Sequence, residues 1–296
     1  MYGTVPDGTT KDLTRPGGPA PLPLTPGRRA ALALGVPVCL VVVLAIAFNV
    51  VAAIGRASIP VRYALPAGAA GVSVSTSGGD LSLRQATSGQ ASLTGTASYS
   101  LIRPHLTRQF TAGQDVIGYS CPMPLGDCGL DGTLSVPSGT HVSIATGGGN
   151  VSAVGTNGQV SISTGGGDLT ANQMAGDLTL STGGGNITAT TVTATQFSAD
   201  TGGGNITASA VSSSQVIADT GGGDVEIVFT TVPHNVQVST GGGNVTIIVP
   251  PGTAEYHVTA TPTGGTLTND LPQNSASTNQ ITATTSGGNI TLRQSP

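Results

Sequence analysis

Residues 178–206 read LTLSTGGGNITATTVTATQFSADTGGGNI, and the unit Thr-Gly-Gly-Gly-Asn stands twice in this stretch. The same unit, ending in Asn or Asp, recurs along the chain at spacings of 18, 18, 19, 19 and 20 residues. A fixed period of this length is typical of an array of stacked structural units. The copies begin at Thr146, Thr164, Thr182, Thr201, Thr220 and Thr240, and looser ones begin at Thr76, Pro262 and Thr285.

Apolar residues hold fixed positions on both sides of each unit. Around Thr182 they are Leu178, Leu180, Ile187 and Ala189, and Ser or Thr residues stand between most of them. This alternation with a period of two predicts two short strands per repeat, and the frequent glycines exclude a helix. Two strands and two turns in 18–20 residues predict one coil of a parallel β-solenoid, in which each apolar position forms a column along the stack.

The repeated turns are expected to be structural. We expect their glycines to turn the backbone through positive φ and to let neighbouring coils approach closely. Asn and Asp tolerate the left-handed conformation and bond to nearby backbone groups. The predicted turn residues are Thr146, Gly147, Gly148, Gly149, Asn150, Thr164, Gly165, Gly166, Gly167, Asp168, Thr182, Asn186, Thr201, Asn205, Thr220, Asp224, Thr240 and Asn244.

The composition restricts the kind of protein. Charged residues make up 8% of the 296 residues, Gly occurs 45 times, and hydrophobic residues reach 38%, which favours a regular β structure over disorder. From residue 55 onward six Arg and no Lys face twelve acidic residues. Binding to nucleic acid depends on basic side chains that neutralise phosphates, so a nucleic-acid partner is not expected.

A membrane segment is expected over residues 30–54, because these 25 residues contain no charge and about 20 apolar residues suffice to cross a bilayer. Arg28 and Arg29 precede it and favour a cytoplasmic N-terminus, with the rest of the chain outside the plasma membrane. A cleaved signal peptide is the alternative, although its apolar region would be shorter. Residues 1–29, rich in Pro and Gly, are expected to be a disordered tail, and residues 55–65 a linker.

The outer domain is expected to span residues 66–296. Residues 84–141 break the repeat and predict a β-rich insertion or cap. This segment holds Cys121 and Cys128, separated by six residues with two Pro and one Gly, and an oxidising exterior favours a disulfide between them. A metal site is disfavoured because the four His residues are scattered.

The serial units from Ala145 to Thr246, and the cysteine loop followed by Leu134-Ser-Val-Pro-Ser-Gly-Thr140, resemble a bacterial family of unknown function described as putative adhesins with β-strand repeats. The resemblance covers about residues 66–293. It implies a right-handed parallel β-helix outside the membrane, and it implies no activity.

A non-catalytic adhesion or envelope-binding module is therefore the preferred hypothesis, with cell-wall polysaccharide or another envelope protein as partner. The alternative is a structural or regulatory envelope scaffold, which would self-associate through its terminal strands or signal through the N-terminal tail. An enzyme is disfavoured because the candidate acids Asp80, Asp168 and Asp224 occupy repeated turn positions. Asp200 and Asp219 are expected to stack in adjacent coils, where a cation could bind, although no metal or cofactor is predicted.

Overall fold

The computed structural model describes residues 38–47, 56–65, 69–100, 102–122 and 128–296. The chain divides into two compact units, Met1–Val50 and Val51–Pro296. The described part of the first unit is a helix over residues 38–47. Among the described residues, no helix has both the length and the apolar character needed to span a bilayer. The expected tail, and residues 30–37 and 48–54 of the expected membrane segment, lie outside the described residues.

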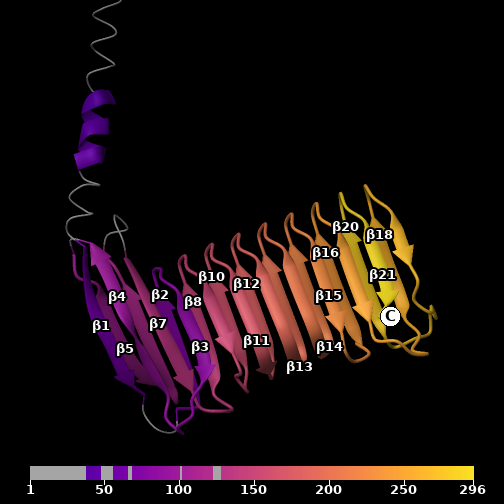
Figure 1. Ribbon diagram of the computed structural model, residues 1–296, viewed down its shortest axis with the longest axis horizontal. Coiled ribbons are helices and arrows are strands. Elements are labelled where there is room, and N and C mark those ends of the chain that lie inside the picture. The colour runs from indigo at the N-terminus through magenta and orange to yellow at the C-terminus, as the bar shows by residue number, and fades with distance from the viewer. Residues whose placement is uncertain (1–37, 48–55, 66–68, 101, 123–127) are drawn as a thin grey trace, which may run out of the picture. The chain divides into compact units, whose positions relative to one another are not determined.

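The second unit, which we call the repeat domain, consists of strands in two parallel stacks (Figure 1). Stack A holds the strands that precede the glycine turns, and stack B holds those that follow them. In stack A the pairing order is β6 (Gln114–Ser120), β2 (Gly71–Thr76), β8 (His141–Thr146), β10 (Val160–Thr164), β12 (Leu178–Thr182), the second parts of β13 (Ile187–Thr201) and β14 (Ile206–Thr220), β16 (Asn235–Thr240), β20 (Gln280–Thr285) and β18 (His257–Pro262).

Stack B repeats this order on the other side of the turns. It runs β7 (Cys128–Val136), β3 (Leu81–Gln85), β9 (Val151–Val154), β11 (Leu169–Ala175), the first parts of β13 and β14, β15 (Val225–Phe229), β17 (Val245–Val249), β21 (Ile290–Gln294) and β19 (Leu267–Asn269). The register joins equivalent residues of successive repeats, such as Ile187 with Ile206 and Phe197 with Val216. The all-β architecture with parallel strands is consistent with the β-solenoid expected from the repeat, and we call each pair of strands joined by a glycine turn a coil.

The coils at the two ends are not stacked in sequence order. At the N-terminal end, the coil of β2 and β3 lies between the later coil of β6 and β7 and the coil of β8 and β9. At the C-terminal end, the last coil, β20 and β21, lies between β16–β17 and the earlier coil of β18 and β19. The position of the loose copy at Pro262 in the sequence suggests a coil between the copies at Thr240 and Thr285. In the structure this copy instead forms the outermost coil.

Residues 84–141 combine a coil with a cap. Within this segment β6 and β7 continue the two stacks, so the segment contains a coil that lacks the glycine motif. Three antiparallel pairings then close the N-terminal end: β5 (His105–Thr111) pairs with β6, β4 (Ser92–Ser100) pairs with β7, and β1 (Arg56–Ala64) pairs with β4. β1 lies in the segment expected to be a linker, so this expectation is wrong for Arg56–Ala64.

The core is built from the expected apolar columns and from two columns that the repeat pattern does not reveal. Leu178, Leu180, Ile187 and Ala189 are all buried, as are their equivalents in the central coils. The first Thr of each unit is also buried, with exposed fractions of 2–6% from Thr76 to Thr285. Each coil bends a second time after the first residues of its stack B strand, and the remaining column lies just beyond this second corner. The column consists of Thr156, Met174, Val192, Val211 and Phe229.

Candidate functional site

The three glycines of each turn differ in their surroundings. A Cβ on Gly183 would lie 2.2 Å from the carbonyl oxygen of Gly165, and one on Gly185 would lie 2.0 Å from that of Gly167. A Cβ on the middle residue, Gly184, would meet no atom within 4 Å. The close approach of neighbouring coils is thus confirmed for the first and third glycines. The expected positive φ is wrong, because no triplet glycine from Gly147 to Gly243 has one.

From Thr164 onward, the Thr of each full Thr-Gly-Gly-Gly unit bonds its coil to the preceding one. The Thr182 hydroxyl donates to the carbonyl oxygen of Gly167 in the preceding coil over 2.8 Å and accepts the Gly185 N–H over 3.2 Å. The same pair of bonds is formed at Thr164, Thr201, Thr220, Thr240 and Thr285. A small β-branched hydroxyl residue suits this position, because it fills the core and satisfies two backbone groups beside the turn.

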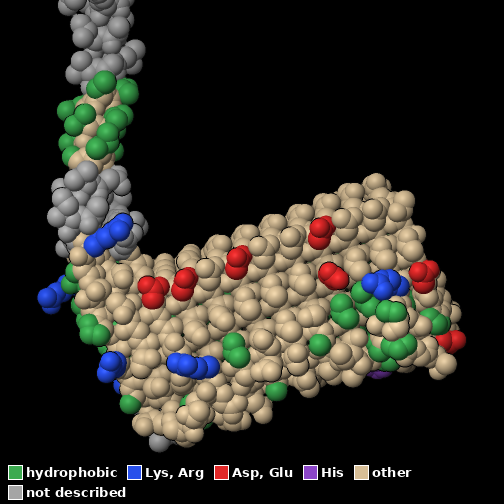
Figure 2. Space-filling view, in the orientation of Figure 1, with side chains coloured by type: hydrophobic (Ala, Val, Ile, Leu, Met, Phe, Trp, Pro, Cys, Tyr) green, Lys and Arg blue, Asp and Glu red, His purple; other side chains and the backbone are tan. Residues whose placement is uncertain are grey.

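The Asn and Asp residues form a second ladder on the outside. The Asp168 Oδ1 accepts the backbone N–H of Asn186 over 2.7 Å, and the Asn186 Oδ1 accepts that of Asn205 over 2.9 Å. The ladder runs through Asp131, Asp80, Asn150, Asp168, Asn186, Asn205, Asp224, Asn244, Asn289 and Thr266. Figure 2 shows acidic side chains in a row along one edge of the domain, whose other side chains on this face are mostly uncharged. The turn acids therefore have structural partners.

The second corner of the coil bends through the left-handed conformation. Gly155, Gln173, Thr191 and Ala210 occupy equivalent positions there, and their φ angles are 66°, 54°, 57° and 51°. Beyond this corner lies an open depression on four successive coils, lined mainly by Thr193, Thr195, Ser212, Ser214 and Thr231. Asp177 is its acidic member, and its carboxylate accepts the Gln196 N–H over 3.0 Å. We call this surface the hydroxyl depression.

Asp200 and Asp219 are direct neighbours in the register of stack A, as expected. Burial, with a smaller contribution from the charge of Asp200, raises the pKa of Asp219. The described residues contain no group of three or more His, Cys, Asp or Glu side chains placed to hold a metal ion. Two carboxylates alone are a sparse ligand set for a cation, since calcium takes six to eight oxygen ligands.

The N-terminal end is closed by an ion pair that the sequence does not reveal. Asp115 is fully buried and occupies the core column of Val72, its register partner. Arg108 on β5 donates to this carboxylate through Nε over 3.1 and 3.2 Å and through Nη2 over 2.6 Å. Nη2 also donates to the Ala64 carbonyl oxygen, and the guanidinium lies 5.9 Å from the ring centroid of Tyr63. The hydrogen bonds with Asp115 raise the pKa of Arg108.

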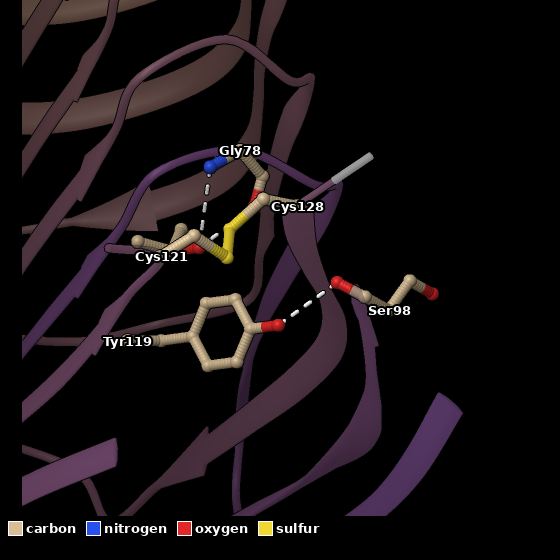
Figure 3. Close-up of a disulfide and its surroundings, with 6 residues drawn as sticks. Gly78, Ser98, Tyr119, Cys121 and Cys128 are labelled. Carbon is tan, nitrogen blue, oxygen red and sulfur yellow. Dashed lines mark hydrogen bonds between the residues drawn. A yellow bond between two sulfur atoms is a disulfide. The ribbon is translucent and has the colours of Figure 1, made fainter. Parts of the chain in front are cut away.

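Cys121 and Cys128 form the disulfide that the sequence favours, at the same end of the domain (Figure 3). It links the end of β6 to the start of β7 and packs against the core. The nearby Tyr119 is buried, and its hydroxyl donates to the Ser98 carbonyl oxygen on β4 over 2.9 Å. The disulfide links the two strands of the outermost N-terminal coil, and the Tyr119 bond ties this coil to its cap.

The structure brings the predicted turn residues together in one line of turns, and it places the aspartate pair on the outward side of stack A. Sequence reasoning missed the Arg108–Asp115 pair, because the irregular segment gives no repeat against which to align it. It also missed the hydroxyl depression, whose only signal is the Ser and Thr content of residues 193–195 and 212–214.

Several solved structures of other proteins match this chain. A structure described as a putative adhesin from Bacteroides fragilis matches with a TM-score of 0.50 and 14% identity, over 81% of this chain and 97% of that one. Another described as a putative adhesin, from Parabacteroides distasonis, matches with a TM-score of 0.46 and 12% identity, over 81% and 97%. One described as a putative lipid binding protein from the same species matches with a TM-score of 0.40 and 10% identity, over 80% and 97%.

At these identities the first match shows the fold alone, and the other two carry no argument. The search of curated proteins finds no match. The family comparison is more decisive, because the model described as Toastrack DUF4097 matches residues 132–293, more than half of the chain. The protein therefore belongs to the Toastrack family, whose domain is one of unknown function.

Proposed function

We propose that this chain is a single-pass membrane protein whose repeat domain, a right-handed solenoid outside the cell, is a non-catalytic adhesion or envelope-binding module. The 25 uncharged residues from 30 to 54, with Arg28 and Arg29 before them, support a membrane anchor with a cytoplasmic N-terminus. The disulfide between Cys121 and Cys128 supports an oxidising exterior.

The observation that carries the binding role is the hydroxyl depression. Its exposed Thr193, Thr195, Ser214 and Thr231 side chains come from successive coils. Parallel strands lie about 4.8 Å apart, so donors and acceptors recur along this surface at a short, constant interval. The Bacteroides fragilis protein of similar fold is described as a putative adhesin, which adds support to this role.

A neutral polysaccharide is the chemistry that this surface fits best. Sugar hydroxyls both donate and accept hydrogen bonds, as the Ser and Thr hydroxyls do. The surface offers one carboxylate, Asp177, and no basic group, so it has little attraction for anionic polymers. Each contact would be weak, and binding would gain strength from repeated contacts along a chain.

The test measures binding of the repeat domain, residues 56–296, to isolated cell-wall polysaccharide. Saturable binding that is lost in the double variant Thr195→Arg with Ser214→Arg supports the proposal, because two large side chains would fill the depression. Thr170→Arg is the matched control, since Thr170 is an exposed outward residue of β11. Absence of binding, or equal binding by the double variant, would contradict the proposed site. Flotation of the full chain with washed membranes tests the anchor separately.

A further inference from the structure

The C-terminal end of the repeat domain is open. Among the described strands, β18 pairs only with β20 and β19 only with β21. Just before β18, Tyr256 pairs with Gln273 on the outer side, and beyond Tyr256 the outer edges of β18 and β19 are unpaired within the described part of the chain. Leu267 of β19 is 44% exposed, whereas its equivalent Ile187 in a central coil is fully buried. Val258 and Ala260 of β18, which stand in core columns, are only half-buried. The core of the domain therefore ends in a partly uncovered apolar layer.

The two ends differ in how their edges are treated. At the N-terminal end, β5 and β4 pair antiparallel with β6 and β7, and Arg108 of β5 forms an ion pair with the buried Asp115. At the C-terminal end, residues 257–269 contain no Lys, Arg, Asp or Glu. Proteins usually protect unpaired edge strands with charge or with covering elements, because such edges recruit other strands. An edge strand with neither charge nor a covering element is expected where a protein uses that edge to pair with another strand.

The backbone groups that face the open edge can be assigned. The His257 N–H donates to Asn279 and the Thr263 N–H donates to Thr285, both on the β20 side, over 2.8 and 2.9 Å. Successive residues of a strand direct their N–H and C=O groups to opposite edges. Val258 and Ala260 therefore present their N–H and C=O groups at the open edge.

We propose that this edge pairs with the same edge of a second copy of the chain, antiparallel and two-fold about Thr259. In this register Val258 lies opposite Ala260 of the second copy, and each such pair exchanges two hydrogen bonds. The exposed N–H groups of Val258 and Ala260 are then satisfied, inward side chains meet inward side chains, and no like charges face each other. The strand is thus self-complementary in its hydrogen bonds and in its alternation.

The position of the edge gives this pairing a role, and this step rests on the proposed membrane anchor. The anchor precedes Arg56, the first residue of β1, at the N-terminal end of the domain. The open coil lies at the opposite end of the stacks (Figure 1). With the anchor attached at one end of the domain and the open edge at the other, contact between C-terminal ends can join chains on two facing membranes. The end of one solenoid is a small interface, so each contact is weak and many contacts must act together.

The experiment uses two vesicle populations that carry the full chain and different fluorophores, and it measures their clustering. Ala260→Pro removes one of the N–H groups at the open edge and none on the β20 side. Val258→Lys places like charges near each other across the contact. We expect the native protein to cluster vesicles, and either variant to slow clustering by about tenfold or more, the equivalent of 1.4 kcal/mol. Val154→Lys, at an outward residue of β9 that is 41% exposed, should cluster like the native protein.

Several outcomes would overturn the proposal. They are absence of clustering by the native protein, clustering by Ala260→Pro at the native rate while its thermal unfolding is unchanged, and head-to-tail filaments of the repeat domain. Clustering with vesicles that carry no protein would point to a lipid partner and would also overturn it. If the full chain does not float with the vesicles, the anchor fails. The repeat domain, which contains its own core, is then tethered chemically at residue 56 and the same test is made.

Discussion

At the residue scale, the glycine triplet shows that one repeated sequence can hide three different requirements. The first and third glycines lie where a Cβ would overlap the backbone of the preceding coil, and the middle one faces open space. Sequence periodicity alone does not separate these cases, because all three positions are Gly in each of the central copies. The separation comes from the stacking direction, which only the three-dimensional arrangement supplies.

Replacing Gly185 by Ala should therefore destabilise the domain, and replacing Gly184 by Ala should not. The Gly185 Cβ would lie 2.0 Å from a backbone oxygen that cannot move without parting two coils, so we expect a loss of about 3 kcal/mol. Gly184→Ala should change the free energy of unfolding by no more than about 0.5 kcal/mol. Denaturant unfolding of both variants checks this. Equal effects of the two substitutions would mean that the coils are less tightly stacked than described.

Asp219 predicts a dependence of stability on pH. Because burial raises its pKa in the folded state, the folded protein binds the proton more tightly than the unfolded chain does. Stability from this group is then present at low pH and is lost as the pH rises from the ordinary pKa of 3.8 through the folded value. Asp219→Asn should stabilise the domain at pH 7 and bring little gain at pH 3.5.

The measurement is the unfolding midpoint of the variant and of the native protein across this pH range. Asp270→Asn, at an exposed residue near the C-terminal end, is the control. A constant difference between Asp219→Asn and the native protein at all pH values would show that the ionisation of Asp219 is not the cause.

At the scale of elements, the N-terminal cap depends on a charge inside a core column. Arg108→Met should destabilise the domain by about 2–3 kcal/mol, because it leaves the Asp115 carboxylate buried without its partner. This estimate lies below the usual range for buried pairs because the Arg108 side chain is 34% exposed. The double variant Arg108→Met with Asp115→Val should recover most of the loss, since Val continues the column of Val72. Thermal unfolding of the three proteins checks this, and a double variant no more stable than Arg108→Met would contradict it.

The repeated elements could be predicted from the sequence, and the irregular ones could not. Leu178, Leu180, Ile187 and Ala189 alternate with polar residues, so their strands and their inward direction follow from local pattern. The coil of β6 and β7 could not be predicted, because its inward residues are Asp115, Ile117 and Tyr119. A charged residue in a core column obscures the apolar period of two. The hydroxyl depression could not be predicted for a different reason. It forms only when residues one coil apart are brought side by side.

At the scale of the whole molecule, the order of the end coils links distant parts of the chain. The first and last coils in sequence are covered on both sides by other coils. In an array stacked in sequence order, the terminal coils would be covered on one side and could open independently. Here the last coil cannot open without separating β18 and β19 from the rest, so the C-terminal end should open as one cooperative unit.

This arrangement predicts that, in a chain ending at residue 279, structure is also lost in residues that are still present. The truncation deletes β20 and β21, which alone among the described strands pair with β18 and β19. The amides of His257–Pro262 should then exchange with solvent at least about tenfold faster, although this segment is still present. In a chain ending at residue 250 the β16 and β17 amides lose one neighbour and should stay largely protected, because their partners β14 and β15 remain. Hydrogen exchange with mass spectrometry separates the two truncations. Native-like protection of His257–Pro262 in the chain ending at residue 279 would mean that β18 can dock directly on β16, and the coil order would then not determine how this end unfolds.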